Sequence, residues 1–389
     1  MNRQRNLIIL VYFTLFMGLG AFFPFMSIYL KDTLHFNGEQ IGLFYSLSSL
    51  IVVISVPFFG ILADKIRSAK TVFVLCALAT VVFLIPFTML KGVFIMTFLY
   101  VIINGLRSVL VPMTDTLSIE YQFKYSGNYG FFRSVGSFSF IMSSILTGFL
   151  LERFDQYSAL FLYIHIVFLI LCAFFASRLE NNHVHTNDNI SIINHIKDLL
   201  KNKKYLLIIF IMAIANGLVQ LSQSYISLAV MELGGSSQIV GLSVFFLVIP
   251  EVIFYSFVLK WAKKLSHMHL ILFGCLYLLL RWIVLFFTNS LPILLIFSTG
   301  HGIVMAFVVL VGIDLIKLNV KPNLISSAIS VYTGLSYVFF AVISFGTGMI
   351  MGNDGSVKNT YLLYIVTTLC AIVGIIIYMY KYQRRSFNG

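Results

Sequence analysis

The chain has 389 residues, of which 59% are hydrophobic and only 10% are charged, and its formal net charge is +12. A soluble globular domain needs more charged residues than this to cover its surface, so the composition excludes a soluble protein. The apolar residues form blocks about twenty residues long, which is the length of a membrane-spanning helix. They do not alternate with polar residues as the strands of an outer-membrane barrel do. We therefore predict an all-α membrane protein.

Twelve apolar blocks are expected to span the membrane. The first block follows Arg3 and Arg5. We interpret it as a retained helix, because it is too long for the core of a signal peptide and lacks a small-residue cleavage pattern. The predicted spans are 7–30, 40–63, 71–90, 93–113, 129–150, 158–178, 205–231, 238–260, 269–288, 291–314, 323–350 and 360–380.

A long polar stretch follows the sixth span. It predicts an N-terminal six-helix half at 1–179, a cytoplasmic central loop at 180–204 and a C-terminal six-helix half at 205–389. Three histidines in this loop are a weak indication of a metal site, and we interpret them instead as part of a solvated linker: His183, His185 and His195. The four cysteines stand alone within apolar blocks, so we expect neither a disulfide framework nor a metal, and no cofactor.

The positive charge is distributed unevenly along the chain. Lysine and arginine gather on the cytoplasmic side of membrane proteins. If both termini are cytoplasmic, most of the 26 basic residues fall in inner segments, and the outer segments hold only Lys31, Lys91, Arg153 and Lys358. This pattern predicts a multi-pass protein of the plasma membrane, the inner membrane of the cell. It also assigns the basic residues to anionic lipid headgroups rather than to nucleic acid.

The two halves are related to one another. One fixed shift along the chain aligns span with span and basic loop with basic loop, and it places Gly42 on Gly241 and Cys76 on Cys275. Two parallel six-helix halves place a binding site at their interface, near the middle of the membrane. Because one chain contains both halves, we expect a monomer.

The loop after the second span carries a recognisable motif. It contains Gly60, Asp64, Lys65 and Arg67, and this spacing resembles the signature of the major facilitator superfamily. The glycine would permit close helix packing, and the aspartate would lie at a helix end facing basic residues. We therefore expect these four residues to act as a gating motif in a major facilitator fold.

A second resemblance extends over the whole chain and is to the phenylpropionate-permease and lactose-permease branch of that superfamily. It is carried by the segments 111–115, 129–137, 250–254, 280–282 and 300–302. The resemblance implies a proton symporter for a small organic solute. Two departures argue against lactose as the solute. Val304 occupies the place of an essential glutamate, and Phe140 the place of a sugar-stacking tryptophan.

Charged residues within the spans are the strongest candidates for function, because a charge in the bilayer is costly unless it is paired or faces water. Asp115 and Arg133, on consecutive spans, either bind substrate or lock two helices together. Arg107 meets an anionic substrate or balances an acid. Further candidates for substrate binding are Phe140, Gln220 and Gln223. The two glutamines share a helix face that either lines a cavity or joins helices.

A second group of residues, in the C-terminal half, is expected to couple transport to protons. A carboxyl group in an apolar environment can hold a proton and release it when water or a cation approaches. Glu251, which follows Pro250, is the candidate for this role, with Arg281 and His301 as its partners. His301 is explained equally well as a histidine whose hydrogen bonds a neighbour satisfies.

These observations predict a secondary active transporter that uses the proton gradient to take up an aromatic acid, a sugar or a nucleoside by alternating access. Export by proton antiport is the alternative. It is disfavoured because the fifth span contains Gly130, Gly136 and Gly148 but lacks the proline typical of exporters. A third hypothesis is a membrane protein that does not transport, such as a sensor or a lipid-modifying enzyme. The sequence contains no nucleophile–base pair at a recognisable spacing, so we expect no enzymatic activity.

Overall fold

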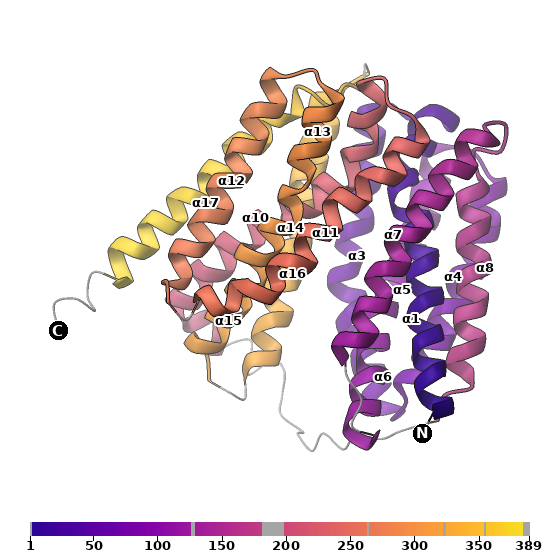
Figure 1. Cartoon of the computed structure of the whole chain (residues 1–389), viewed down its shortest axis with the longest axis horizontal. Coiled ribbons are helices and arrows are strands. Elements are labelled where there is room, and N and C mark those ends of the chain that lie inside the picture. The colour runs from indigo at the N-terminus through magenta and orange to yellow at the C-terminus, as the bar shows by residue number, and fades with distance from the viewer. Residues whose placement is uncertain are drawn as a thin grey trace. The chain divides into compact units, whose positions relative to one another are not determined.

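The computed structural model describes residues 2–125, 129–180, 198–262, 264–321, 324–353 and 355–383. Within these ranges the chain is helical and contains no strand (Figure 1). Eleven helices are long and apolar enough to cross a membrane, and a shorter apolar stretch, Ser237–Glu251, lies in helix α11 (Ser237–Ala262). The predicted all-α membrane fold is therefore confirmed. The three histidines of the central loop lie outside the described residues.

The chain forms two compact units, and each is described here by itself. Unit 1 consists of Met1–Phe36, Leu43–Asn187 and Gly235–Val244, and unit 2 consists of Asn37–Gly42, Asp188–Gly234 and Phe245–Gly389. Two helices are divided between the units. Helix α3 (Gly38–Lys65) begins in unit 2 and continues in unit 1, whereas α11 begins in unit 1 and continues in unit 2.

Unit 1 contains helices from the first six predicted spans. Its core helix is α1, which packs against α7 and α8, while α4 packs against α5 and α8. The helices of this unit are α1 (Asn2–Phe22), η1 (Phe23–Phe25), α2 (Met26–Ile28), η2 (Tyr29–Thr33), α3, α4 (Ala69–Met89), α5 (Val93–Arg107), α6 (Leu110–Tyr125), α7 (Tyr129–Arg153) and α8 (Leu160–Ser177).

Unit 2 repeats this plan with α10 as its core helix, which packs against α16 and α17, while α12 packs against α17. The helices of this unit are α10 (Lys203–Glu232), α11, α12 (His267–Phe287), α13 (Leu291–Ser298), α14 (Gly300–Val304), η3 (Met305–Leu310), α15 (Val311–Asn319), α16 (Ile325–Met351), α17 (Thr360–Tyr378) and η5 (Met379–Gln383).

Three predicted spans differ from the helices observed. The first changes to a 3-10 turn at Phe23–Phe25, where Pro24 cannot donate to the helical ladder. The fourth is two helices, because α5 ends at Arg107 and α6 continues to Tyr125, well beyond the predicted end at 113. The tenth is interrupted by a π-helical turn at Met305–Leu310, a feature that is frequent at functional sites.

Side chains near the helix starts explain several of the boundaries. The Ser68 hydroxyl accepts a hydrogen bond from the Thr71 amide at 3.2 Å at the start of α4. The Asn37 side chain accepts from the Gln40 amide at 2.9 Å, and the Gln40 side chain accepts from the Asn37 amide at 3.0 Å. This reciprocal arrangement satisfies backbone donors that the first turn of α3 would otherwise leave unpaired.

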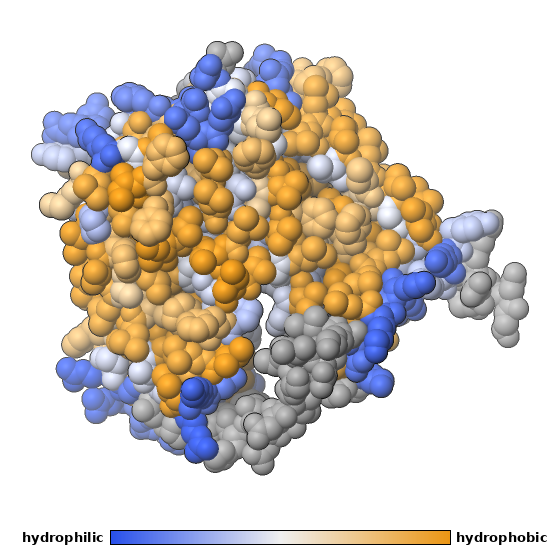
Figure 2. All heavy atoms as spheres, turned by 180° about the vertical axis from the view of Figure 1, so that it is seen from behind, coloured by the Kyte–Doolittle hydropathy of each residue, from blue (hydrophilic) through white to orange (hydrophobic). Residues whose placement is uncertain are grey.

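The outward faces of the helices are apolar. Phe94, Phe287 and Met89 are all highly exposed, and Figure 2 shows hydrophobic residues covering the helix surfaces, with hydrophilic residues gathered near helix ends. A soluble protein does not expose apolar surface on this scale, whereas a membrane protein presents it to lipid.

Two glycines that the internal repeat relates to each other make matching close helix contacts. In unit 2, a Cβ atom added to Gly42 would lie 2.6 Å from the Gly348 Cα, and the Ser344 hydroxyl donates to the Gly42 carbonyl at 3.5 Å. In unit 1, a Cβ atom added to Gly241 would collide with the Ser144 carbonyl, and the Ser144 hydroxyl donates to the Gly241 carbonyl at 3.3 Å. Glycine at both positions allows the backbones to touch.

Replacing Gly42 with alanine is expected to destabilise the chain by about 1–3 kcal/mol, because the added methyl group overpacks this crossing. Gly60→Ala is the matched control on the same helix. A Cβ atom there meets no described atom of its own unit within 4 Å, so this change should be neutral or stabilise by about 0.5–1 kcal/mol. Thermal denaturation of the purified variants measures both, and equal midpoints would refute the close crossing at Gly42.

Candidate functional site

The charged pair predicted in the first half lies on α6 and α7 of unit 1. The nearest atoms of the pair, Arg133 Nη1 and Asp115 Oδ1, are 3.7 Å apart, and the two side chains are 42% and 27% exposed. This separation is longer than a hydrogen bond, and a partly exposed ion pair contributes at most about 1 kcal/mol. The pair therefore holds the two helices together only weakly, and Arg133 Nη1 is buried without a hydrogen-bond partner among the described residues.

Tyr12 of α1 positions the acid of this pair. Its hydroxyl donates to Asp115 Oδ1 at 2.7 Å and lies 3.0 Å from the Ser118 hydroxyl. The Tyr12 ring is stacked on Phe16 with a centroid distance of 6.0 Å, and the Arg133 guanidinium lies 5.1 Å from the Phe16 ring centroid. Asp115, Arg133 and these two aromatic rings form what we call the α1–α6–α7 cluster.

No local sequence pattern marks the hydroxyl of Tyr12 as a partner of Asp115. The two residues are 103 positions apart, and only the packing of α1 against α6 brings them together. Phe140 lies elsewhere on α7, where its backbone carbonyl meets Gly20 of α1, and its side chain is half-buried.

Arg107 is enclosed by aromatic rings at the end of α5. It is only 4% exposed, and its guanidinium lies 4.6 Å from the centroid of Phe22 and 4.1 Å from that of Phe23. It also donates to the Asn104 side-chain oxygen at 2.5 Å. Such cation–π contacts stabilise a desolvated cation by up to about 2 kcal/mol each, so Arg107 is held by its own unit.

Helices α10, α11 and α14 of unit 2 bring three of the predicted residues into one region. Gln223 Nε2 lies 3.1 Å from His301 Nε2. The next residue, Gly302, meets the backbone of Glu251 so closely that a Cβ atom there would collide with it. This contact joins α10 to α14. Gln220, one turn earlier on α10, is half-buried.

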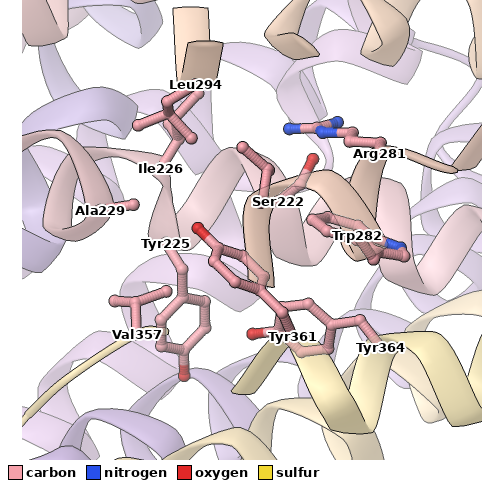
Figure 3. A pocket seen from close by; sticks show the side chains of 11 residues that line it. Ser222, Tyr225, Ile226, Ala229, Arg281, Trp282, Leu294, Val357, Tyr361 and Tyr364 are labelled. Carbon is pink, nitrogen blue, oxygen red and sulfur yellow. The ribbon is translucent and has the colours of Figure 1, made fainter. Parts of the chain in front are cut away.

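Arg281, expected to join Glu251 and His301, lines a pocket of unit 2 (Figure 3). It is 1% exposed, and its guanidinium lies 4.7 Å from the Trp282 ring centroid. Further lining residues come from α10 and α17, including Tyr225, Tyr361 and Tyr364. The free space is about 20 Å³, enough for about one water molecule. Arg281 acts electrostatically on His301 but shares no hydrogen bond with it among the described residues.

The gating motif shows one clear departure from expectation. Gly60 was expected to allow close helix packing, yet a Cβ atom there meets no described atom of its own unit within 4 Å. Asp64, Lys65 and Arg67 are exposed. Arg67 has φ of +54° and its amide donates to the Asp64 carbonyl at 3.2 Å. The motif thus forms a tight turn at the end of α3.

Two basic residues that were expected only to lie in loops make specific contacts in unit 1. Lys70 donates to the Leu179 carbonyl at 2.8 Å, which satisfies a backbone acceptor just beyond the end of α8. Lys124 pairs with Glu180 at 3.0 Å, and the Tyr125 hydroxyl donates to the same carboxylate at 3.0 Å. These bonds raise the pKa of Lys124 and lower the pKa of Glu180.

One ion pair of unit 2 was not anticipated. His267 Nε2, at the start of α12, lies 2.9 Å from Asp314 Oδ2 of α15. The two residues are 47 positions apart, and no local sequence pattern marks them as partners.

Comparison with known proteins gives the family. A model of the MFS_1 like family matches residues 7–363. The chain is 23% identical over 375 residues to the Uncharacterized transporter YwbF of Bacillus subtilis (strain 168), covering 96% of this chain and 93% of that protein. It is 22% identical over 388 residues to the maltose permease of Geobacillus stearothermophilus, covering 99% of this chain and 96% of that protein.

Two further similarities are more limited. The Probable 3-phenylpropionic acid transporter of Escherichia coli (strain K12) is 34% identical over 151 residues, which covers 37% of this chain and 38% of that protein. Among solved structures, a mutant of the nucleoside transporter NupG has a TM-score of 0.85 at 16% identity, covering 96% of this chain and 99% of that chain. At this identity, the structural likeness is evidence of a shared fold alone.

The family match, the apolar helices and the relatives agree with one another, and they confirm the resemblance on which the sequence analysis relied. The chain belongs to the MFS_1 like family and is a membrane transporter of the major facilitator type, not an enzyme.

Proposed function

We propose that this transporter takes up a small organic solute together with protons, by alternating access, as a monomer in the plasma membrane with both termini in the cytoplasm. The α1–α6–α7 cluster is the observation that carries the proposal. It places a loosely paired carboxylate and guanidinium, both partly exposed, within apolar helices. A carboxylate and a guanidinium that are not closed on each other can form hydrogen bonds with a solute.

The chemistry of the cluster favours a solute with a ring and hydrogen-bonding groups. Asp115 accepts hydrogen bonds and Arg133 donates them, so together they suit the hydroxyl groups of a sugar or nucleoside. Arg133 also suits the carboxylate of an aromatic acid. The rings of Tyr12 and Phe16 offer apolar faces beside these groups. The names of relatives point the same way: maltose, 3-phenylpropionic acid and, for the solved structure, nucleosides.

Proton coupling is assigned in this proposal to Glu251 with Arg281 and His301, and Gln223 contacts His301. Glu251 follows Pro250 within α11 and lies against Gly302 of α14. A hydrogen-bonded histidine and a nearby carboxyl group can exchange a proton near neutral pH. Glu251 would take up a proton when the solute binds and would release that proton on the other side of the membrane. Uptake would therefore depend on the proton gradient.

The direct test uses de-energised cells that overproduce the chain in weakly buffered medium. Pulses of maltose, nucleosides and 3-phenylpropionate are added while the external pH is recorded, and cells without the protein are the control. We expect the medium to become more alkaline with one class of solute only. No response to any solute would refute proton-coupled uptake of these classes. Proton-dependent efflux from loaded cells would then establish export.

A further inference from the structure

The pocket around Arg281 holds buried hydrogen-bond donors that no residue described in unit 2 satisfies. Nε and Nη1 of Arg281 and Nε1 of Trp282 are fully buried, and none of them has an acceptor among the described residues. In Figure 3, Arg281 and Trp282 lie on one side of the pocket, and Tyr225, Ile226 and Val357 lie on the other. A buried cation of this kind requires a compensating negative group.

None of the residues that line the pocket carries a negative charge. Glu232, an acid of the same unit, accepts hydrogen bonds from the Ser356 hydroxyl at 2.6 Å and from the Val357 amide at 2.7 Å, so its carboxylate holds the loop before α17. The Ser222 hydroxyl donates to the Val219 carbonyl at 2.8 Å. The walls therefore supply positive charge and donors, but no anion.

We propose that this pocket binds one small monovalent anionic group, held by Nε and Nη1 of Arg281, with Trp282 in the wall beside it. The free space of about 20 Å³ corresponds to about one water molecule, which suits a chloride ion or the carboxylate end of a larger molecule. A phosphate ester or a sugar ring does not fit this space. Arginine is well suited to the role, because its fork of donors is rigid and keeps its charge when buried.

The site extends the proposed function, since proton-coupled uptake by itself needs no anion. If the anionic group is the carboxylate of the carried solute, the inference rests on the proposed uptake of such a solute. If it is a free halide, the site is independent of which solute is carried. The shared chemistry is a single negative charge of about the size of a water molecule.

The two tryptophans of the chain make the pocket directly observable. Replacing Trp261 with phenylalanine leaves Trp282, in the wall of the pocket, as the sole tryptophan. The purified variant is titrated with chloride, bromide, iodide, formate and benzoate, and gluconate keeps the ionic strength constant. We expect a saturable change in Trp282 fluorescence.

The same titrations are made after a second substitution in the Trp261→Phe chain. Arg281→Gln is expected to weaken binding at least about 10-fold, because a charged hydrogen-bond donor is lost. Lys317→Gln, which removes an exposed cation of the same unit, is the matched control and should bind like the parent. If Arg281→Gln does not fold, Arg281→Lys keeps the charge but loses the fork of donors, and its affinity should also fall.

The anions themselves distinguish the two sources. Saturation by halides alone identifies a free ion, whereas competition of chloride with formate and benzoate identifies a carboxylate. Quenching that rises linearly without saturation for every anion, and equally with and without Arg281, would overturn the proposal. Because binding is measured without transport, a failed uptake experiment does not affect this result.

Discussion

Replacing Arg133 with glutamine is expected to weaken substrate binding about 10- to 100-fold, which is the loss associated with one charge-assisted hydrogen bond. The fold should persist, because the pair with Asp115 is partly exposed and its nearest atoms are 3.7 Å apart. The loss of binding is measured as the affinity of the purified variant for the solute that the uptake experiment identifies. The persistence of the fold is measured as the thermal midpoint of the same variant.

Lys124→Gln is the matched control for this experiment. It breaks another ion pair of α6, between Lys124 and Glu180, at an exposed position outside the α1–α6–α7 cluster. Affinity should be unchanged. If Arg133→Gln fails to accumulate in the membrane while Lys124→Gln does so normally, the Asp115–Arg133 pair is a helix lock and the substrate role is wrong.

Replacing Glu251 with glutamine is expected to abolish accumulation of solute driven by the proton gradient, while exchange of labelled for unlabelled solute continues. Glutamine has nearly the same shape but cannot carry a proton, so the loaded transporter can still reorient while the coupling is lost. Uptake and exchange in proteoliposomes, with and without a pH gradient, measure the two activities separately.

Glu39→Gln serves as the control for the loss of a carboxylate, because Glu39 is exposed in the first turn of α3. Both activities of this control should match those of the unchanged chain. Accumulation that persists in Glu251→Gln would remove Glu251 from the coupling role. Loss of accumulation and exchange together would instead assign Glu251 to substrate binding or to the packing of α11 on α14.

The pairing of residues within each unit explains why the candidate site was only partly predictable. Asp115 and Arg133 are marked in the sequence because charged residues stand out within apolar blocks. Their neighbour Tyr12 is not marked, because tyrosines are frequent in this chain and nothing local distinguishes one of them. Likewise Gln223 and His301 are 78 positions apart, and their contact depends on how α14 packs against α10.

Interruptions within helices were also beyond prediction. The break after Arg107 and the π-helical turn at Met305–Leu310 lie within blocks that are apolar on average. Hydropathy averages over such blocks, so it indicates that a segment spans the membrane but not whether its helix is continuous. Gly60 illustrates the reverse error, because a motif glycine implied a close contact that its own unit does not make.

The sequence by itself determined the class of this protein, its apolar helices, the relation between its halves and the short list of charged residues within its spans. These properties are predictable because the bilayer imposes the same requirements on every spanning segment. Each segment must be apolar over the thickness of the membrane, and its backbone groups must form hydrogen bonds with one another. Only the tertiary structure decided that Tyr12 holds Asp115, that Gly42 meets Gly348, and that aromatic rings line the pocket of Arg281. Such contacts join residues far apart in the chain, and they arise from side-chain packing that no local pattern records.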